Sequence, residues 1–382
     1  MAWSETNPMR ERLRFISDLE TCLYSMSELC EMYGISRKTG YKWAERYAAE
    51  GLEGLADRSR APNSCPHRIR PEIREAILDL RHEHPTWGPR KLRTVLKSQQ
   101  PEQPWPAAST IGDLLKREGL VKARPRRSRP PHPGRPRFEA RAPNDVWSID
   151  FKGDFLTGDR RKCYPLTVVD QRSRYLLSCQ GLDGPRGAPV RRILESLFEA
   201  YGLPQAILSD NGTPFSSSTS LSRLSRLSVW WLKLGIEPLL IEPGRPEQNG
   251  RHERLHRTLK EDTARPPAKN LATQQERFDQ FRRIYNEQRP HEALEQQPPA
   301  TIYTTSGKPY PRTIPEPEYP GHYHVRRVRR TGEIKWKGAT PFLSETLAGE
   351  LVGLEEVDEG VWSVYFGERL LKRISHQEIS KR

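Results

Sequence analysis

The hydrophobic positions of the chain change their period near residue 144. Over residues 9–60 and 71–118, apolar side chains recur three to four residues apart, as they do on one face of a helix. Beyond residue 144, short runs of β-branched and aromatic residues alternate with glycine turns and with further helical stretches. We therefore expect all-helical units first and a region of mixed strands and helices after them.

The first helical unit carries clear start and turn signals. Ser25 and Glu28 have the spacing of a capping box, Gly34 allows a tight turn, and Ser36 begins a second helix over 36–49. A helix, a glycine turn and a basic helix form the helix-turn-helix pattern, in which the second helix enters the major groove of DNA. Ordinary helical hairpins share this pattern. The candidate DNA-contacting residues are Arg37, Lys38 and Lys42.

A similar arrangement recurs in the next sixty residues. The pattern predicts helices over 71–84, 90–98 and 109–118, with Pro89 at the first position of the middle helix. We expect a second helix-turn-helix unit or a winged-helix-type domain here. Trp87 fits the core of such a small domain better than a surface for stacking bases.

Strand patterns dominate the central part of the chain. The predicted strands are 146–156, 165–171, 174–180, 205–210 and 236–241, and the predicted helices are 189–201, 221–234, 248–262 and 275–286. This order predicts an α/β core with a mixed five-stranded sheet. The tail, 322–376, alternates short β-prone runs with glycine turns, which predicts a small SH3-like β-barrel.

Positive charge gathers outside the helical units. The chain has 63 Lys and Arg against 49 Asp and Glu, yet residues 1–120 hold 19 basic and 17 acidic residues. Residues 121–141 hold eight basic residues, one Glu and five prolines, so an extended basic strap is expected that suits a polyanion, although a solvated linker has the same composition. A second basic stretch covers 322–337, and together the two favour nucleic acid as the partner. The candidate contacts in the strap are Arg126, Arg127 and Arg129.

Length and composition exclude several classes of protein. With 382 residues the chain is expected to form two to four domains, and its 34 prolines suggest rigid connectors. The sequence has no run of 18 apolar residues, so no membrane span is expected. The N-terminus lacks the apolar segment of a secretory signal, and the five cysteines form no CxxC pair, so a reducing cytosol is expected.

Three carboxylates are candidates for catalysis. Asp150 lies within a predicted strand, Asp210 ends another, and Glu253 lies in the first turns of a helix. Acids at strand ends and a helix start can meet at one edge of a mixed sheet, where Mg²⁺ would offset their repulsion. Two such ions would serve phosphodiester chemistry. Asp170 and Asp183 are similar acids near strand ends, and an Asp-Asn-Gly sequence is often only a turn.

Three segments carry a resemblance to a known family. WSID (147–150), SDNGTPF (209–215) and PEQNGRHERLHRTLK (246–260) are similar to the integrase catalytic core shared by retroviral integrases and bacterial insertion-sequence transposases. The resemblance covers residues 144–305. It implies an RNase H-like fold and a DDE-type transposase, a polynucleotidyl transferase with two Mg²⁺ or Mn²⁺ ions per active site.

The resemblance also implies roles for individual residues. It places the catalytic and metal-binding acids at Asp150, Asp210 and Glu253, and DNA contacts at Asn249, Arg257 and Lys260. Glu247 competes as the third acid because its distance from Asp210 is nearer the family's common spacing. Glu253, however, follows the Asn-Gly pair by three residues, as the family's glutamate does. The choice of the third acid stays open.

Two alternative functions are weighed against this one. Residues 252–256 also read HExxH, the pattern of zinc hydrolases, but the helix around it is rich in arginine and lysine, which would oppose a zinc ion. A DNA-binding regulator without catalysis would use the same helical units, but three clustered acids would weaken its affinity for DNA unless a cation offset them. We therefore expect a DNA transposase.

The expected organisation follows from these patterns. We predict double-stranded DNA as the partner (terminal inverted repeats and target DNA), homo-oligomers on DNA and a bacterial cytoplasmic location on the nucleoid. The predicted domains are a helix-turn-helix domain (1–60), a second one of helix-turn-helix or winged-helix type (61–122), a basic linker (123–143), the integrase core (144–305), a linker (306–320) and the small barrel (321–382).

Overall fold

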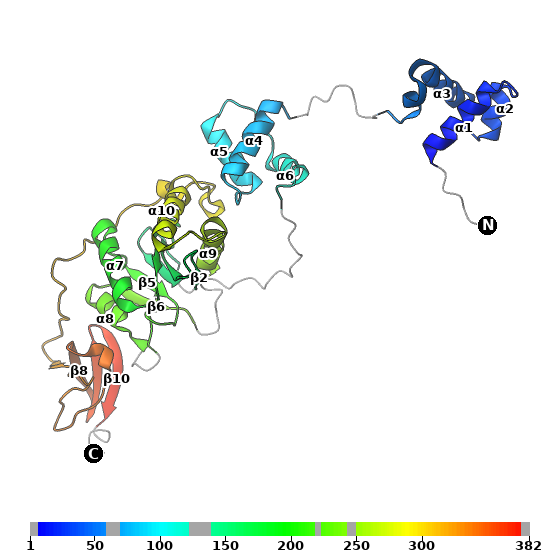
Figure 1. Cartoon of the computed structure of the whole chain (residues 1–382). Coiled ribbons are helices and arrows are strands. Elements are labelled where there is room, and N and C mark those ends of the chain that lie inside the picture. The colour runs from blue at the N-terminus through cyan, green and yellow to red at the C-terminus, as the bar shows by residue number, and fades with distance from the viewer. Residues whose placement is uncertain (1–6, 59–68, 122–138, 218–222, 243–249, 376–382) are drawn as a thin grey trace, which may run out of the picture. The chain divides into compact units, whose positions relative to one another are not determined.

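The computed structural model describes residues 7–58, 69–121, 139–217, 223–242 and 250–375 (Figure 1). The chain divides into two compact units, Met1–Ile69 and Arg70–Arg382. Each unit is described by itself. The finer division into six segments stays a prediction.

The first unit is a small helical domain. Its elements are α1 (Pro8–Glu20), α2 (Met26–Met32), α3 (Arg37–Glu50) and the short 3-10 helix η1 (Gly51–Leu55). The predicted capping box is present, because Ser25 accepts from the backbone N–H of Glu28 and the Glu28 carboxylate accepts from that of Ser25. Ser36 caps α3 in the same way, through the N–H of Thr39. A core that includes Trp43 holds the helices together.

The second unit begins with three more helices. These are α4 (Pro71–Glu83), α5 (Pro89–Gln99) and α6 (Ala108–Arg117), close to the predicted bounds. Pro71 and Pro89 stand at helix starts, where a missing N–H costs nothing. Trp87 is buried against the ring of His84, with ring centroids 3.7 Å apart, and its place in a small core is confirmed. Residues 69–121, all described, contain no strand, so this range holds no wing.

A mixed sheet forms the centre of the second unit. Its strands are β1 (Val146–Phe151), β2 (Phe155–Leu156), β3 (Lys162–Asp170), β4 (Leu176–Leu182), β5 (Ala206–Ser209) and β6 (Glu237–Leu240). The order is β2-β3-β1-β5-β6, with β4 also paired to β3. β3 runs antiparallel to β1 and β4, whereas β5 runs parallel to β1 and β6.

The predicted mixed sheet is confirmed, with one difference in its strands. The segment predicted as one strand, 146–156, is divided into β1 and β2, so the sheet has six strands rather than five. Both pieces pair with β3. Gly153 lies between them at φ +85°, a conformation that interrupts a strand and that glycine adopts readily.

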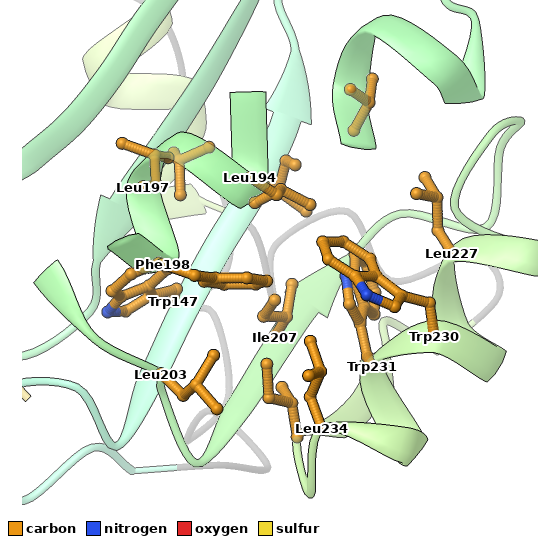
Figure 2. Close-up of a cluster of buried hydrophobic side chains, with 14 of the residues drawn as sticks. Trp147, Leu194, Leu197, Phe198, Leu203, Ile207, Leu227, Trp230, Trp231 and Leu234 are labelled. Carbon is orange, nitrogen blue, oxygen red and sulfur yellow. The ribbon is translucent and has the colours of Figure 1, made fainter. Parts of the chain in front are cut away.

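Helices cover both faces of this sheet. On one face α7 (Gly187–Tyr201) and α8 (Arg226–Lys233) pack large apolar side chains onto β1, β3 and β5. Figure 2 shows Trp147, Phe198 and Trp231 within this cluster. On the other face α9 (Gly250–Thr263) and α10 (Leu271–Glu287) pack a second cluster, which includes Leu255, Leu259 and Phe278.

The C-terminal region is a separate antiparallel sheet. Its strands are β7 (His324–Arg327), β8 (Leu351–Asp358), β9 (Val361–Phe366) and β10 (Arg369–Ser375), in the order β10-β9-β8-β7. The short 3-10 helices η4 (Glu292–Leu294), η5 (Pro299–Thr301) and η6 (Glu345–Leu347) complete the second unit.

The predicted SH3-like barrel is not confirmed. In the described part of the chain β7 and β10 are the open edges of the sheet, so the strands do not close into a barrel. The predicted β-prone run around Trp336 forms only isolated bridges, Glu333 to Phe342 and Trp336 to Ala339. Gly338, between the bridged residues Trp336 and Ala339, has φ +83°.

No helix among the described residues is both long enough and apolar enough to cross a lipid bilayer.

Candidate functional site

Asp150 and Asp210 lie next to each other at the ends of two neighbouring strands. β1 and β5 run parallel, and their register pairs Ser148 with Leu208 and Ile149 with Ser209. The residue after Ile149 is Asp150 and the residue after Ser209 is Asp210. Both lie at the carboxyl ends of their strands, and neighbouring strands are about 4.8 Å apart. Because side chains alternate along a strand, both aspartates belong to the face of Ser148, opposite the apolar cluster of α7 and α8.

Both aspartates are half-buried. One oxygen of Asp210 accepts a hydrogen bond from the backbone N–H of Gly212 at 3.1 Å. Burial nevertheless raises the pKa of Asp210, since that bond offsets only part of the lost hydration. An anion in this position gains from a nearby cation, so the two neighbouring carboxylates fit a hard divalent ion such as Mg²⁺ or Mn²⁺.

Helix α9 presents two different stripes of side chains. His252, Leu255, His256 and Leu259 have helical spacing and are all buried. Glu253 belongs to the neighbouring stripe and is exposed, as are Arg257 and Lys260 four and seven residues further on. The candidate acid and the two candidate phosphate-binding cations therefore share one face of the helix.

Glu253 does not complete a metal cluster with the aspartates. Within the ranges described, no three side chains of His, Cys, Asp or Glu are gathered closely enough to hold a metal ion. The structure thus brings two of the three predicted acids together through strand register. The role of Glu253 stays a prediction, as does the number of ions.

The two histidines of the HExxH sequence face the sheet. Their Nε2 atoms lie 2.6 Å (His252) and 2.7 Å (His256) from Oγ1 of Thr167, and Nδ1 of His252 lies 3.0 Å from Oγ of Ser148. Burial lowers the pKa of His252 to about 3 and that of His256 to about 2, so both rings are neutral. Because both rings are engaged with the sheet, they form no zinc site with Glu253, whose side chain is exposed.

The predicted DNA-contacting residues that the structure describes are exposed. Arg37, Lys38 and Lys42 lie on α3, where Nζ of Lys42 sits 4.3 Å from the centroid of the Trp43 ring. The remaining candidates, Asn249, Arg126, Arg127 and Arg129, and the competing Glu247 lie outside the described residues.

Sequence reasoning missed the polar residues that hold α9. Thr167 and Ser148 were not singled out, and the histidines drew notice only through the zinc pattern. One signal could have indicated that the histidines are buried: residues 252, 255, 256 and 259 have the spacing of one helix face, on a helix that is otherwise mostly charged.

Family models match most of the described chain. Two models of an integrase core domain match residues 140–246 and 234–299. A homeodomain-like model matches residues 39–115, and a helix-turn-helix model matches residues 11–63. A solved structure, the HTLV-2 integrase catalytic core domain in complex with magnesium, aligns with 44% of this chain and 100% of its own at 15% identity and a TM-score of 0.34.

Two bacterial relatives are similar to about two thirds of this chain. The 39.2 kDa protein of insertion element IS476 from Xanthomonas euvesicatoria is 33% identical over 67% of this chain and 71% of its own. The 31.7 kDa protein of insertion element IS407 from Burkholderia multivorans is 30% identical over 66% of this chain and 87% of its own. On this similarity and these domain models, the chain belongs to the insertion-element transposases that carry an integrase-type catalytic core.

Proposed function

We propose that this transposase cuts and joins DNA phosphodiesters at the sheet edge formed by Asp150 and Asp210. The observation that supports the proposal is the parallel register of β1 and β5, in which Asp150 and Asp210 follow the paired residues Ile149 and Ser209. Glu253 on α9 is the proposed third acid. When bound by these acids, one or two Mg²⁺ or Mn²⁺ ions would stabilise the charge on the attacking and leaving oxygens.

The proposed reaction has a binding step and two transfer steps. Arg257 and Lys260, exposed on the face of α9 that carries Glu253, bind phosphates of the DNA end. A water attacks phosphorus at that end, and the 3′ oxygen leaves with a proton as a free hydroxyl. The hydroxyl then attacks a target phosphodiester, whose own 3′ oxygen leaves. No covalent bond between protein and DNA is needed.

The helical units supply recognition of the element's ends in this proposal. The exposed Arg37, Lys38 and Lys42 place positive charge on α3, the second helix of the helix-turn-helix pair. Terminal inverted repeats are the proposed target of this helix, and several copies of the protein bridge two ends. Because the relatives are bacterial, the proposed place of action is the nucleoid DNA of a bacterial cytoplasm.

The test is a cleavage and joining assay with full-length protein, Mg²⁺ or Mn²⁺ and a labelled duplex that ends in the element's terminal repeat. Glu253→Gln is expected to abolish cleavage and joining while end binding, measured by mobility shift, stays near the wild-type level. Glu247→Gln, the matched variant, is expected to keep both activities. If Glu247→Gln abolishes cleavage and Glu253→Gln does not, Glu247 is the third acid. If both variants cleave normally, the proposed active site is wrong.

A further inference from the structure

Helix α9 meets the sheet through a small buried group of polar side chains. His252 and His256 stand one helical turn apart, and their Nε2 atoms converge on the single hydroxyl of Thr167 in β3. All three residues are buried, with exposed fractions of 2%, 5% and 0%. Ser148 of β1, also buried, contacts the other nitrogen of His252. Four polar side chains thus link α9 to β1, the strand that carries Asp150, and to its neighbour β3.

The hydrogens available to this group limit its bonding patterns. Thr167 has one hydroxyl proton, and its Oγ1 also lies within hydrogen-bond distance of the backbone oxygen of Asp150. At least one of the two imidazoles must therefore donate from Nε2 to Thr167. The single hydroxyl proton of Ser148 is likewise shared between two acceptors, Nδ1 of His252 and the backbone oxygen of Val169.

The same group reaches the candidate active site. Nδ1 of His256 is 3.9 Å from Oδ2 of Asp150, which is beyond hydrogen-bond distance. Oγ1 of Thr167 also lies 3.3 Å from the backbone oxygen of Asp150. Asp150 is therefore contacted at both its main chain and its side chain by the same group.

The same contacts determine how α9 is rotated on the sheet. Residues of a helix advance by about 100° each, so fixing His252 and His256 against Thr167 also fixes the direction of Glu253. Leu255 and Leu259 already pack α9 against the apolar cluster of this face. Apolar side chains alone tolerate small rotations, whereas two hydrogen bonds to one oxygen do not. Buried polar groups that specify one geometry are a known use of such networks.

We propose that His252 and His256 are positioning residues of the active site: through Thr167 and Ser148 they hold α9 in one rotation, which directs Glu253 relative to the strand that carries Asp150. This inference rests on the proposed function, since it concerns the same acids. It goes further, because it assigns the histidines of the HExxH sequence to the orientation of cation ligands rather than to zinc. Orienting groups of this kind are typically worth 10- to 100-fold in metal affinity or activity.

Two substitutions of His256 separate positioning from packing. Asparagine places its side-chain nitrogen near the position of Nδ1, whereas glutamine places it near that of Nε2. His256→Gln therefore keeps a polar contact with Thr167, and His256→Asn gives it up. The measurement is Mn²⁺ binding to the full-length protein without DNA, by electron paramagnetic resonance, together with the thermal unfolding midpoint without metal.

We expect His256→Asn to weaken Mn²⁺ binding about tenfold or more. His256→Gln should bind Mn²⁺ more tightly than His256→Asn. Equal Mn²⁺ affinities for His256→Asn and wild type would overturn the proposal, and so would equal losses in the two variants.

A second pair keeps the test decisive if the His256 variants do not fold. Thr167→Val keeps the shape of the side chain and removes the hydroxyl, and Thr167→Ser restores the hydroxyl. The valine variant should bind Mn²⁺ more weakly and need more Mn²⁺ for half-maximal cleavage, and the serine variant should recover both. Wild-type behaviour of Thr167→Val would overturn the proposal.

Failure of the proposed function is separately visible. Asp150→Asn and Asp210→Asn must each weaken Mn²⁺ binding if these carboxylates hold cations. If they do not, the proposed function fails, whatever the histidine variants show. If they do while His256→Asn behaves as wild type, only the positioning role fails.

Discussion

The two faces of the central sheet are built from different kinds of side chain. Towards α7 and α8 the strands present Trp147, Ile149 and Ile207, each at most 1% exposed, in an apolar cluster. Towards α9 the sheet presents Ser148 from β1 and Thr167 from β3, which are equally buried but polar. Both faces exclude water, so burial alone does not distinguish them.

The difference shows which face provides cohesion and which provides geometry. Apolar packing is proportional to buried area and has little directional preference. The hydrogen bonds between Thr167 and the two histidines require a particular geometry, and they lie on the side where Asp150 and Asp210 end their strands. We infer that the first face mainly stabilises the fold and the second mainly orients the candidate site. The predictions below test this division, beginning with the largest expected effect.

Removing a charge from the polar face should abolish activity without unfolding the protein. Asp150→Asn is expected to reduce DNA cleavage in Mg²⁺ by on the order of 10³-fold or more, because a cation ligand is lost at the reacting phosphate. The matched control is Asp154→Asn, an acid between β1 and β2 that pairs with Lys162. Cleavage rates and mobility shifts of both variants provide the comparison, and an active Asp150→Asn protein would remove the polar face from the mechanism.

Truncating a large side chain on the apolar face should do the opposite. Trp231 is fully buried between the sheet and α8, so Trp231→Ala is expected to lower the free energy of unfolding by about 3–5 kcal/mol. Urea unfolding measures the loss. Leu156→Ala, at a position 52% exposed, should change the free energy by less than about 0.5 kcal/mol. Similar losses for the two variants would contradict the assignment of cohesion to this face.

A half-buried histidine that follows α10 in the sequence should make stability depend on pH. Burial, with a further contribution from Lys91, lowers the pKa of His291 to about 3, and its ring lies 4.7 Å from that of Tyr285. The unfolded chain takes up this proton below about pH 6.5 and the folded chain does not. The stabilisation is therefore complete above about pH 6.5 and is lost as the pH falls towards 3.

The size of this pH effect follows from one proton. When the pH falls from 7 to 5, protonation of His291 in the unfolded chain should lower the free energy of unfolding by about 2 kcal/mol. The variant His291→Phe should lack this decrease. Urea unfolding of both proteins at the two pH values gives the difference. Parallel pH dependences would show that the folded protein protonates His291 freely.

The smallest expected effect compares two buried serines. Oγ of Ser148 contacts Nδ1 of His252, whereas Oγ of Ser363, buried in β9, has no hydrogen-bond partner among the described residues. Ser148→Ala should lower the free energy of unfolding by about 1 kcal/mol, because it leaves a buried imidazole nitrogen unpaired. Ser363→Ala should be neutral or slightly stabilising. The reverse order in urea unfolding would indicate that the polar group on the α9 face contributes no specific contact.

Local signals predicted most of the elements correctly. The capping box of Ser25 and Glu28 and the prolines at 71 and 89 mark helix starts through contacts within a few residues, and the structure has them where expected. The alternating strands of the core are similarly readable. The interruption at Gly153 and the open C-terminal sheet were not predicted, since both depend on how distant segments pair.

The candidate site was predictable in part for the same reason. The resemblance singled out Asp150 and Asp210, and strand register places them together. Thr167, in contrast, stands 85 and 89 residues before the two histidines that it contacts. A local pattern can show that His252 and His256 share a stripe, but only the folded chain shows that this stripe meets Thr167 and leaves Glu253 exposed.

The central claim is that Asp150 and Asp210 together hold a divalent cation, and one measurement tests it most directly. A crystal structure of the full-length protein with Mn²⁺ and a duplex of the element's end, recorded at a wavelength where manganese scatters anomalously, locates the ion. We predict an anomalous peak in contact with carboxylate oxygens of both aspartates, about 2.0–2.6 Å from each. A peak at other side chains, in a protein that cleaves the same duplex, would contradict the claim.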